Sequence, residues 1–166
     1  MSVAAAVPEA FRSPLAGVGD LPWTSFVAAM AEPEFAHAAN ETGHLGLFLF
    51  SVARLCHLGY CANVQYSAGP VGRVGTADFA GGLTEEEFLA RPVAQYQIFV
   101  QSCSAYWPSL PADPAPIAGV AVTPSGLLAV AHRAGLRGLK GWLKSPADRE
   151  SHPFTTDAFS RANGLF

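Results

Sequence analysis

The acidic side chain with the most suggestive position in this sequence is Glu34, directly after Pro33. Proline removes a helical hydrogen-bond donor and clashes with the preceding turn, so we expect Glu34 at a helix end or in the loop that follows. A carboxylic acid at such a place can point into a cleft and, in partly apolar surroundings, donate a proton as a general acid. The alternatives are an ordinary solvent-facing glutamate at a helix end, and Glu32 as the competing acid.

Cysteine and histidine offer little further chemistry. The three cysteines are Cys56, Cys61 and Cys103, and a small odd number fits a reduced compartment better than a disulfide framework. Zinc would require paired ligands at regular spacing, and only Cys56, His57 and Cys61 form a cluster. Buried cysteines acting as small hydrophobic residues are the better interpretation, so we expect no metal and no other cofactor.

Composition restricts the class of protein. The chain has 166 residues, of which 50% are hydrophobic and 14% charged, which suits one compact domain with a buried core. Its net charge of -3 argues against nucleic acid as a partner, because phosphate binding needs clustered basic residues. No apolar run of the roughly 20 residues that span a membrane is present, so we expect no membrane insertion. The N-terminus lacks the basic start of a classical signal peptide, which predicts synthesis in the cytoplasm.

Proline, glycine and capping residues divide the first half of the chain. Residues 1–22 are expected to form an irregular arm, followed by a helix over 25–32 that is capped by Thr24. A second, central helix is predicted over 45–58, ending at Gly59 as a left-handed cap. Residues 61–83 are rich in glycine and predict a long loop with at most a short hairpin.

The second half of the chain predicts further helices. Thr84 and Glu87 form a capping-box pattern, and a long helix is expected over 92–107. After a proline-rich connection, helices are predicted from Pro124 to about residue 134 and over 136–143, separated by Gly135; Thr155 or Thr156 caps a last helix. The predicted fold class is all-α with at most a small hairpin, as one domain over 23–166 with a loop-rich cleft.

Five segments in this order carry a family resemblance: Gly43 to Phe50, then Phe88-Leu89 with Pro92 and Gln95, then Tyr106-Trp107, then Thr123 to His132, and Thr155-Thr156-Asp157 with Phe159. Together they resemble a lysozyme-like family of phage tail and lysis proteins and secretion-system spikes, similar to goose-type lysozymes and soluble lytic transglycosylases. The resemblance covers roughly residues 24–166 and implies a single lysozyme-like helical domain.

The resemblance implies cleavage of peptidoglycan glycan strands, by a muramidase or a lytic transglycosylase. In the family a helix that opens with phenylalanine carries the catalytic glutamate eight residues later, which from Phe26 leads to Glu34. One acid suffices when the substrate's own acetamido group stabilises the cation. A two-carboxylate mechanism would need a second acid, for which the sequence offers Asp78; a turn aspartate is the alternative.

Several departures from the family pattern surround this site. Leu49 replaces a substrate-holding glutamine, His44 replaces an aromatic residue, and Phe35 follows Glu34 where small residues are usual. Leu49 and a segment after Glu34 that is shorter than in the family favour an alternative, a catalytically degenerate domain that binds glycan or another protein in a phage-like particle or secretion apparatus. The retained Glu34 and the downstream helices favour cleavage. A third possibility is a helical interaction protein with accidental motif matches.

The candidate substrate-binding residues are His44, Tyr60, Tyr66, Tyr106 and His132. Tyrosines can stack against sugar rings, although such residues more often belong to the core. His132 either contacts substrate or satisfies a backbone carbonyl inside the core. The expected partners are glycan strands, with phage-tail or secretion-system proteins as further candidates. Such a function requires delivery to the cell wall or inclusion in a virion-like particle.

Overall fold

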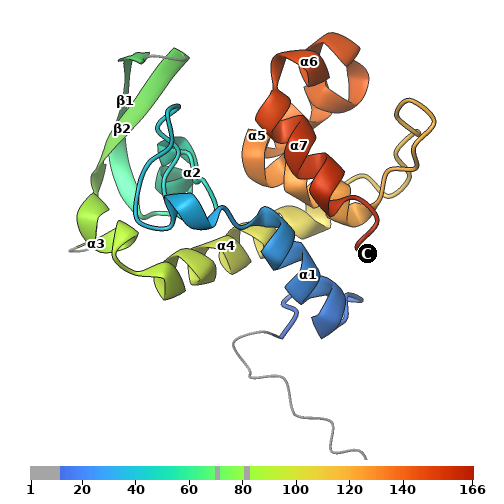
Figure 1. Ribbon diagram of the computed structural model, residues 1–166, viewed down its shortest axis with the longest axis horizontal. Helices are drawn as coiled ribbons and strands as arrows, with labels where there is room; N and C mark the ends of the chain where they lie inside the picture. The colour runs from blue at the N-terminus through green and yellow to red at the C-terminus, as the bar shows by residue number, and fades with distance from the viewer. Residues whose placement is uncertain (1–11, 70–71, 81–82) are drawn as a thin grey trace, which may run out of the picture. The chain divides into compact units, whose positions relative to one another are not determined.

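The computed structural model describes residues 12–69, 72–80 and 83–166 (Figure 1). The chain divides into two compact units, which we name the hairpin unit, Ala31–Cys103, and the helical unit, Met1–Met30 with Ser104–Phe166. Of the predicted N-terminal arm, residues 1–11 lie outside the described part of the chain.

The helical unit is built on helices α1 (Asp20–Met30), α5 (Pro124–Lys144), α6 (Pro146–Ser151) and α7 (Pro153–Ala162), with a short 3-10 turn η3 at Trp107–Ser109. Helix α5 packs against α7, and α1 also contacts α7. The core between them is apolar, and its buried side chains include Trp23, Phe26, Leu127, Leu128 and Phe159.

Helix α1 begins five residues earlier than the sequence predicted, at Asp20. Trp23, Phe26 and Met30 are all fully buried, and their spacing of three and four residues fits one helical face. Thr24 is therefore inside the helix, where its hydroxyl donates to the Asp20 carbonyl at 2.8 Å instead of capping the N-terminus. The predicted irregular arm to residue 22 is wrong in its last three residues.

Helix α5 confirms a break that the sequence predicted. Gly135 has a φ of +70° inside it, so two helical stretches meet there. Thr123 caps its start. The last helix differs from the prediction, because α7 begins at Pro153 and Thr156 lies within it. The Thr156 hydroxyl donates to the Arg149 carbonyl at 2.8 Å, so it ties α7 to the unpredicted helix α6.

The hairpin unit contains a 3-10 turn η2 (Pro33–Phe35), helix α2 (Val52–His57), strands β1 (Cys61–Gly69) and β2 (Gly72–Phe79), helix α3 (Glu85–Leu89) and most of helix α4 (Pro92–Tyr106). The strands pair antiparallel from Cys61 opposite Phe79 to Gly69 opposite Gly72. Its core is rich in phenylalanine: Phe48, Phe50, Phe88 and Phe99 are buried, and the rings of Phe48 and Phe99 stack at 4.1 Å.

The all-α prediction is wrong, because the described chain is a mixed α+β structure. The glycine-rich segment expected to be a loop forms two strands of nine and eight residues. Asn63 to Ala68 do alternate polar and apolar residue types, as strands do, although most side chains of β1 are exposed. The hairpin allowed for in 61–83 is thus present, and it is longer than the short one predicted.

The central helix predicted over 45–58 is also shorter, since α2 covers only Val52–His57. Residues 45–50 form a tight turn closed by two backbone hydrogen bonds between Leu45 and Phe50, of 2.8 and 2.9 Å. Gly46 and Leu49 adopt positive φ angles of 73° and 50° in this turn. These angles lie outside the right-handed helical region, so residues 45–50 do not extend α2 toward the N-terminus. Gly59, with a φ of 87°, confirms the predicted left-handed end of the helix.

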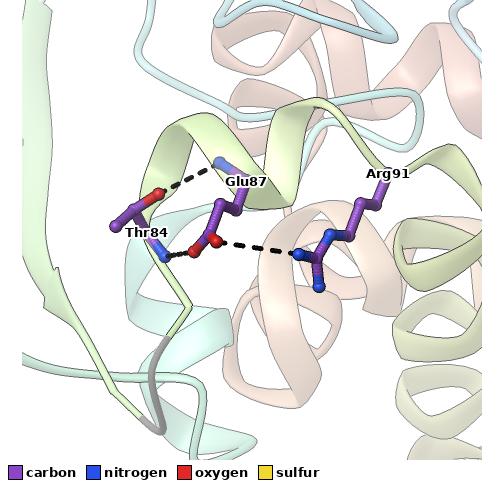
Figure 2. Close-up of polar contacts among 3 residues, drawn as sticks. All are labelled: Thr84, Glu87 and Arg91. Atoms are coloured by element: carbon purple, nitrogen blue, oxygen red, sulfur yellow. Dashed lines mark hydrogen bonds and ion pairs between the residues drawn. The ribbon is translucent and has the colours of Figure 1, made fainter.

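The capping box predicted at Thr84 is confirmed (Figure 2). The Glu87 N–H donates to the Thr84 hydroxyl at 3.1 Å, and the Thr84 N–H donates to the Glu87 carboxylate at 2.8 Å. Arg91 lies 3.6 Å from the same carboxylate, but both side chains are largely exposed, so this ion pair contributes little.

Because of this capping box, we predict that the stability of the fold depends on pH. The hydrogen bond from the Thr84 backbone lowers the pKa of Glu87 from its ordinary 4.5, so the ionised side chain stabilises the fold above pH 4.5. That contribution is lost as the pH falls through the lowered pKa. We expect an NMR titration of the Glu87 carboxyl to give a midpoint below 4.5, and the stability difference between wild type and Glu87→Gln to shrink at lower pH. A midpoint at or above 4.5 would contradict the assignment.

Candidate functional site

Glu34, the predicted general acid, lies in the 3-10 turn η2 of the hairpin unit. The side chain is exposed, and it forms no hydrogen bond or ion pair with any described residue. The backbone around it is well anchored, because the Glu32 N–H donates to the Leu47 carbonyl at 2.7 Å and the Ala36 N–H to the Pro33 carbonyl at 3.2 Å. Glu34 is therefore an exposed carboxylate on a fixed segment, which lacks the burial that a general acid needs.

Gln95 of α4 holds this segment in place from inside the core. Its side chain is fully buried, and its amide nitrogen donates to the Ala36 carbonyl at 2.8 Å. Its oxygen accepts from the Leu47 N–H at 2.6 Å. Gly46 permits this approach, since a Cβ there would lie 2.5 Å from the Gln95 oxygen. Gln95 belonged to the motifs of the family resemblance, but the sequence did not predict that it holds the segment around Glu34.

Tyr66 lies on β1 with half of its surface exposed. The Arg73 guanidinium of β2 lies 5.2 Å from the centre of its ring. Gly75 faces Tyr66 across the sheet, and a Cβ there would lie 3.1 Å from the ring and 2.5 Å from the Val52 side chain of α2. The glycine thus allows the ring edge and Val52 to approach the same point of the strand. Sequence reasoning selected Tyr66 but missed Arg73, whose only signal was its place in the glycine-rich segment.

Asp78, the predicted second carboxylate, lies near the end of β2 and is exposed. One of its oxygens accepts a hydrogen bond of 2.9 Å from the Asn63 amide. Asn63 has a φ of 53° at the point where the pairing of the two strands shifts register. Asp78 is therefore part of a strand and fixes an irregularity of the hairpin, rather than lying in the loop that the sequence predicted.

His44 belongs to a polar loop organised by Asn40. The Asn40 side-chain oxygen accepts from the backbone N–H groups of Thr42 and His44, at 3.1 and 2.9 Å, and from the Thr42 hydroxyl. The His44 ring nitrogen Nδ1 lies 2.8 Å from that hydroxyl. Gly43 brings the loop against β2, because a Cβ there would lie 2.6 Å from the Val74 side chain. His44 is thus held by its own loop beside the sheet.

The other predicted residues fall into both units. Tyr60 is in the hairpin unit, where its hydroxyl donates to the Gln101 side chain at 2.8 Å. Tyr106 and His132 are in the helical unit and are buried, with 8% and 5% of their surface exposed. Their burial favours the core role over direct contact with a ligand. Glu34, His44, Tyr60, Tyr66 and Asp78 thus share one unit, and Tyr66 is the exposed aromatic residue among them.

In comparisons with known proteins, no family model, no curated protein and no solved structure matches this chain. The resemblance to lysozyme-like proteins therefore stays a prediction that rests on the sequence motifs. Among the described helices, none is both long and apolar enough to cross a membrane.

Each unit has a surface cavity that lies wholly within it, and neither of these is lined by a residue predicted from the sequence to bind or cleave a substrate. One, of about 530 Å³, lies in the hairpin unit beside His37, Glu85, Glu86, Leu89 and Ala90. The other, of about 630 Å³, lies in the helical unit and is lined by Ser109, Pro111, Leu136, Leu139, Lys140, Leu143 and Lys144. Within the described ranges, no three His, Cys, Asp or Glu side chains come close enough together to hold a metal ion.

Proposed function

We propose that this protein binds the glycan strands of peptidoglycan through its β1–β2 hairpin and does not cleave them. The observation that carries the proposal is the half-exposed Tyr66 ring with the Arg73 guanidinium beside it. A sugar ring can pack its apolar face on an aromatic side chain. Arginine binds carboxylates with paired hydrogen bonds, and the peptide stems of peptidoglycan carry carboxylates.

The position of Tyr66 also supports a binding role. Gly75 and Val52 bring the strand and α2 together beneath the edge of the ring, so part of its orientation is fixed before a ligand arrives. A ring that is already ordered loses little side-chain freedom on binding, and this favours affinity. The proposal thus requires little rearrangement of the sheet.

The surroundings of Glu34 favour binding over cleavage. A glutamate that protonates a glycosidic oxygen near neutral pH needs apolar surroundings that disfavour its charged form. The Glu34 side chain is exposed, and Leu49, which replaces the family glutamine, is buried. Neither residue therefore provides the environment that the catalytic alternative requires. Binding of cell-wall glycan further implies delivery to the wall or inclusion in a phage-like particle, which we include in the proposal.

Co-sedimentation with purified sacculi tests the binding role. Because aromatic packing contributes about 0.5–1.5 kcal/mol, Tyr66→Ala should weaken binding roughly 2- to 13-fold. Tyr66→Phe retains the ring and should bind as wild type does. Phe154→Ala removes an equally exposed aromatic residue from the helical unit and should have no effect. Equal binding by wild type and Tyr66→Ala would show that the hairpin does not form the binding site. Absence of binding by the wild type would show that the proposed function is wrong.

Release of muropeptides from the same sacculi separates binding from cleavage. We expect no release by the wild type, nor by Glu34→Gln or by Glu41→Gln, which changes another exposed glutamate of the hairpin unit. A general acid contributes roughly 10²- to 10⁴-fold in rate. Release that Glu34→Gln abolishes and Glu41→Gln preserves would show that the protein is an enzyme and that the binding-only proposal is wrong.

A further inference from the structure

Two cysteines of the hairpin unit are in direct contact. Cys56 lies in the last turn of α2, and Cys61 is the first residue of β1. The Cys56 thiol donates a hydrogen bond to the Cys61 sulfur at 2.7 Å, and both residues are free thiols. The two side chains therefore need little movement to become covalently joined.

The turn between the two cysteines is held by the backbone. Gly59 takes its left-handed conformation there, and its N–H donates to the Cys56 carbonyl at 3.0 Å. The Tyr60 N–H donates to the Leu55 carbonyl at 2.9 Å. These bonds fix the end of α2 relative to the start of β1. The contact between the sulfurs is thus a property of the folded turn.

The two thiols have different surroundings. Cys61 is buried, and its sulfur donates to the Val52 carbonyl at 3.4 Å. Burial, together with the adjacent Cys56, raises the pKa of Cys61 to about 12, so its thiol stays protonated at neutral pH. Cys56 is only half-buried, so it is the thiol that a reagent in solution reaches first.

Cys103 provides an internal reference in the same unit. It is fully buried on α4, and burial raises its pKa above the ordinary value of 9.0. A solution reagent reaches such a thiol poorly, because the thiolate that would attack is disfavoured and the sulfur is enclosed.

We propose that Cys56 and Cys61 form a redox-active pair that closes an intramolecular disulfide when the protein meets a low-molecular-weight disulfide such as oxidised glutathione. Cys56 loses its proton to solvent and attacks one glutathione sulfur, which breaks the glutathione disulfide and releases one glutathione thiolate. Cys61 then gives its proton to that thiolate and attacks the Cys56 sulfur, releasing the second glutathione as a thiolate, which takes up a proton from solvent. Two cysteine thiols are oxidised by two electrons, and one oxidised glutathione is reduced to two thiols.

The disulfide covalently joins α2 to β1 across the turn at Gly59. The reaction uses neither Tyr66 nor Arg73, so its test does not require that the protein binds glycan. The sequence predicted that these cysteines act only as small hydrophobic residues, and formation of the disulfide would give them a chemical reaction as well.

Thiol counting on the folded, full-length protein tests the proposal. The reduced protein should take up three alkyl groups after unfolding, one for each cysteine of the chain. After incubation of the folded protein with oxidised glutathione, we expect one alkyl group, located on Cys103 by peptide mapping, and a Cys56–Cys61 disulfide. Three alkyl groups, a lasting glutathione adduct on the wild type, or a disulfide that includes Cys103 would each overturn the proposal.

Single substitutions test the order of the two steps. Cys61→Ala should stop at the first step and retain one glutathione on Cys56. Cys56→Ala should take up no glutathione and keep both remaining thiols, because Cys61 and Cys103 are buried. A glutathione adduct on Cys61 in that variant would contradict the assignment of Cys56 as the attacking thiol. Circular dichroism checks that each variant folds. If a variant does not fold, the peptide map of the wild-type protein decides whether the proposal holds.

Discussion

Gln95→Leu is expected to lower the free energy of unfolding by about 2–4 kcal/mol. The substitution keeps an apolar side chain of similar size in the core but removes the partners of the Leu47 N–H and the Ala36 carbonyl. An unsatisfied, partly buried backbone group costs about 1–3 kcal/mol. The carbonyls of Phe88 and Leu89, which Gln95 also contacts, keep Arg91 and His37 as partners and contribute less.

Gln97→Leu is the matched control, because Gln97 lies on the same helix with its side chain exposed. This variant should unfold within about 0.5 kcal/mol of the wild type. Urea unfolding followed by circular dichroism measures both. Equal stability of the two variants would mean that the Gln95 amide does not hold the η2 segment. Hydrogen exchange at the Leu47 amide should also become faster in Gln95→Leu alone, because only this variant loses its acceptor.

Gly126→Ala is expected to destabilise the helical unit by about 1–3 kcal/mol. A Cβ at residue 126 would lie 2.5 Å from the Asn163 side-chain oxygen and 2.7 Å from the Phe159 ring. That oxygen accepts from both the N–H and the hydroxyl of Thr123, at 2.8 and 3.1 Å, so displacing it also weakens the cap of α5. The higher helix propensity of alanine, about 1 kcal/mol in a helix interior, offsets only part of this cost.

Gly141→Ala makes the same change further along α5 and serves as its control. The added Cβ there would meet the carboxylate end of Asp148, at 2.7 Å from one oxygen. That end of the side chain can rotate away, so we expect no loss and a gain of up to about 1 kcal/mol from helix propensity. Among the wild type and the two variants, Gly126→Ala should therefore have the lowest melting temperature in thermal unfolding. An unchanged melting temperature for Gly126→Ala would show that Phe159 and Asn163 can move aside freely.

Local sequence signals correctly predicted the ends of several elements. The capping box at Thr84, the start of α5 at Pro124 and the break at Gly135 all follow from residues that act within one helical turn. Gly59 marks the end of α2 for a similar local reason, since it takes up a positive φ without steric cost. Each of these features needs no distant partner.

Errors arose where one pattern fitted two structures. Leu45, Phe48 and Leu49 are buried as a helical face would require, but a tight turn buries them as well. The turn is favoured because Gly46 lies against Gln95, which is 49 positions later in the chain. A periodic pattern of apolar residues predicts burial, and it does not record which distant side chain supplies the hydrogen bonds.

The candidate site was predictable in its residues and much less in their environments. Glu34 was expected near a helix end and lies in η2, but its exposure depends on the packing around it. Tyr66 was selected as an aromatic residue, while its partner Arg73 emerged only from the pairing of β1 with β2. The contact between Cys56 and Cys61 likewise depends on the turn at Gly59.

The sequence alone determined the composition of the core, the net charge and the local stops and starts of helices, because these depend on residue type and on neighbours within a few positions. Tertiary structure decided that residues 61–79 form a sheet, that Gln95 anchors the segment carrying Glu34, and that the tyrosine of β1 is exposed. Strand pairing and buried hydrogen bonds join groups far apart in the chain, and their free energy depends on distances that no local pattern of residues specifies.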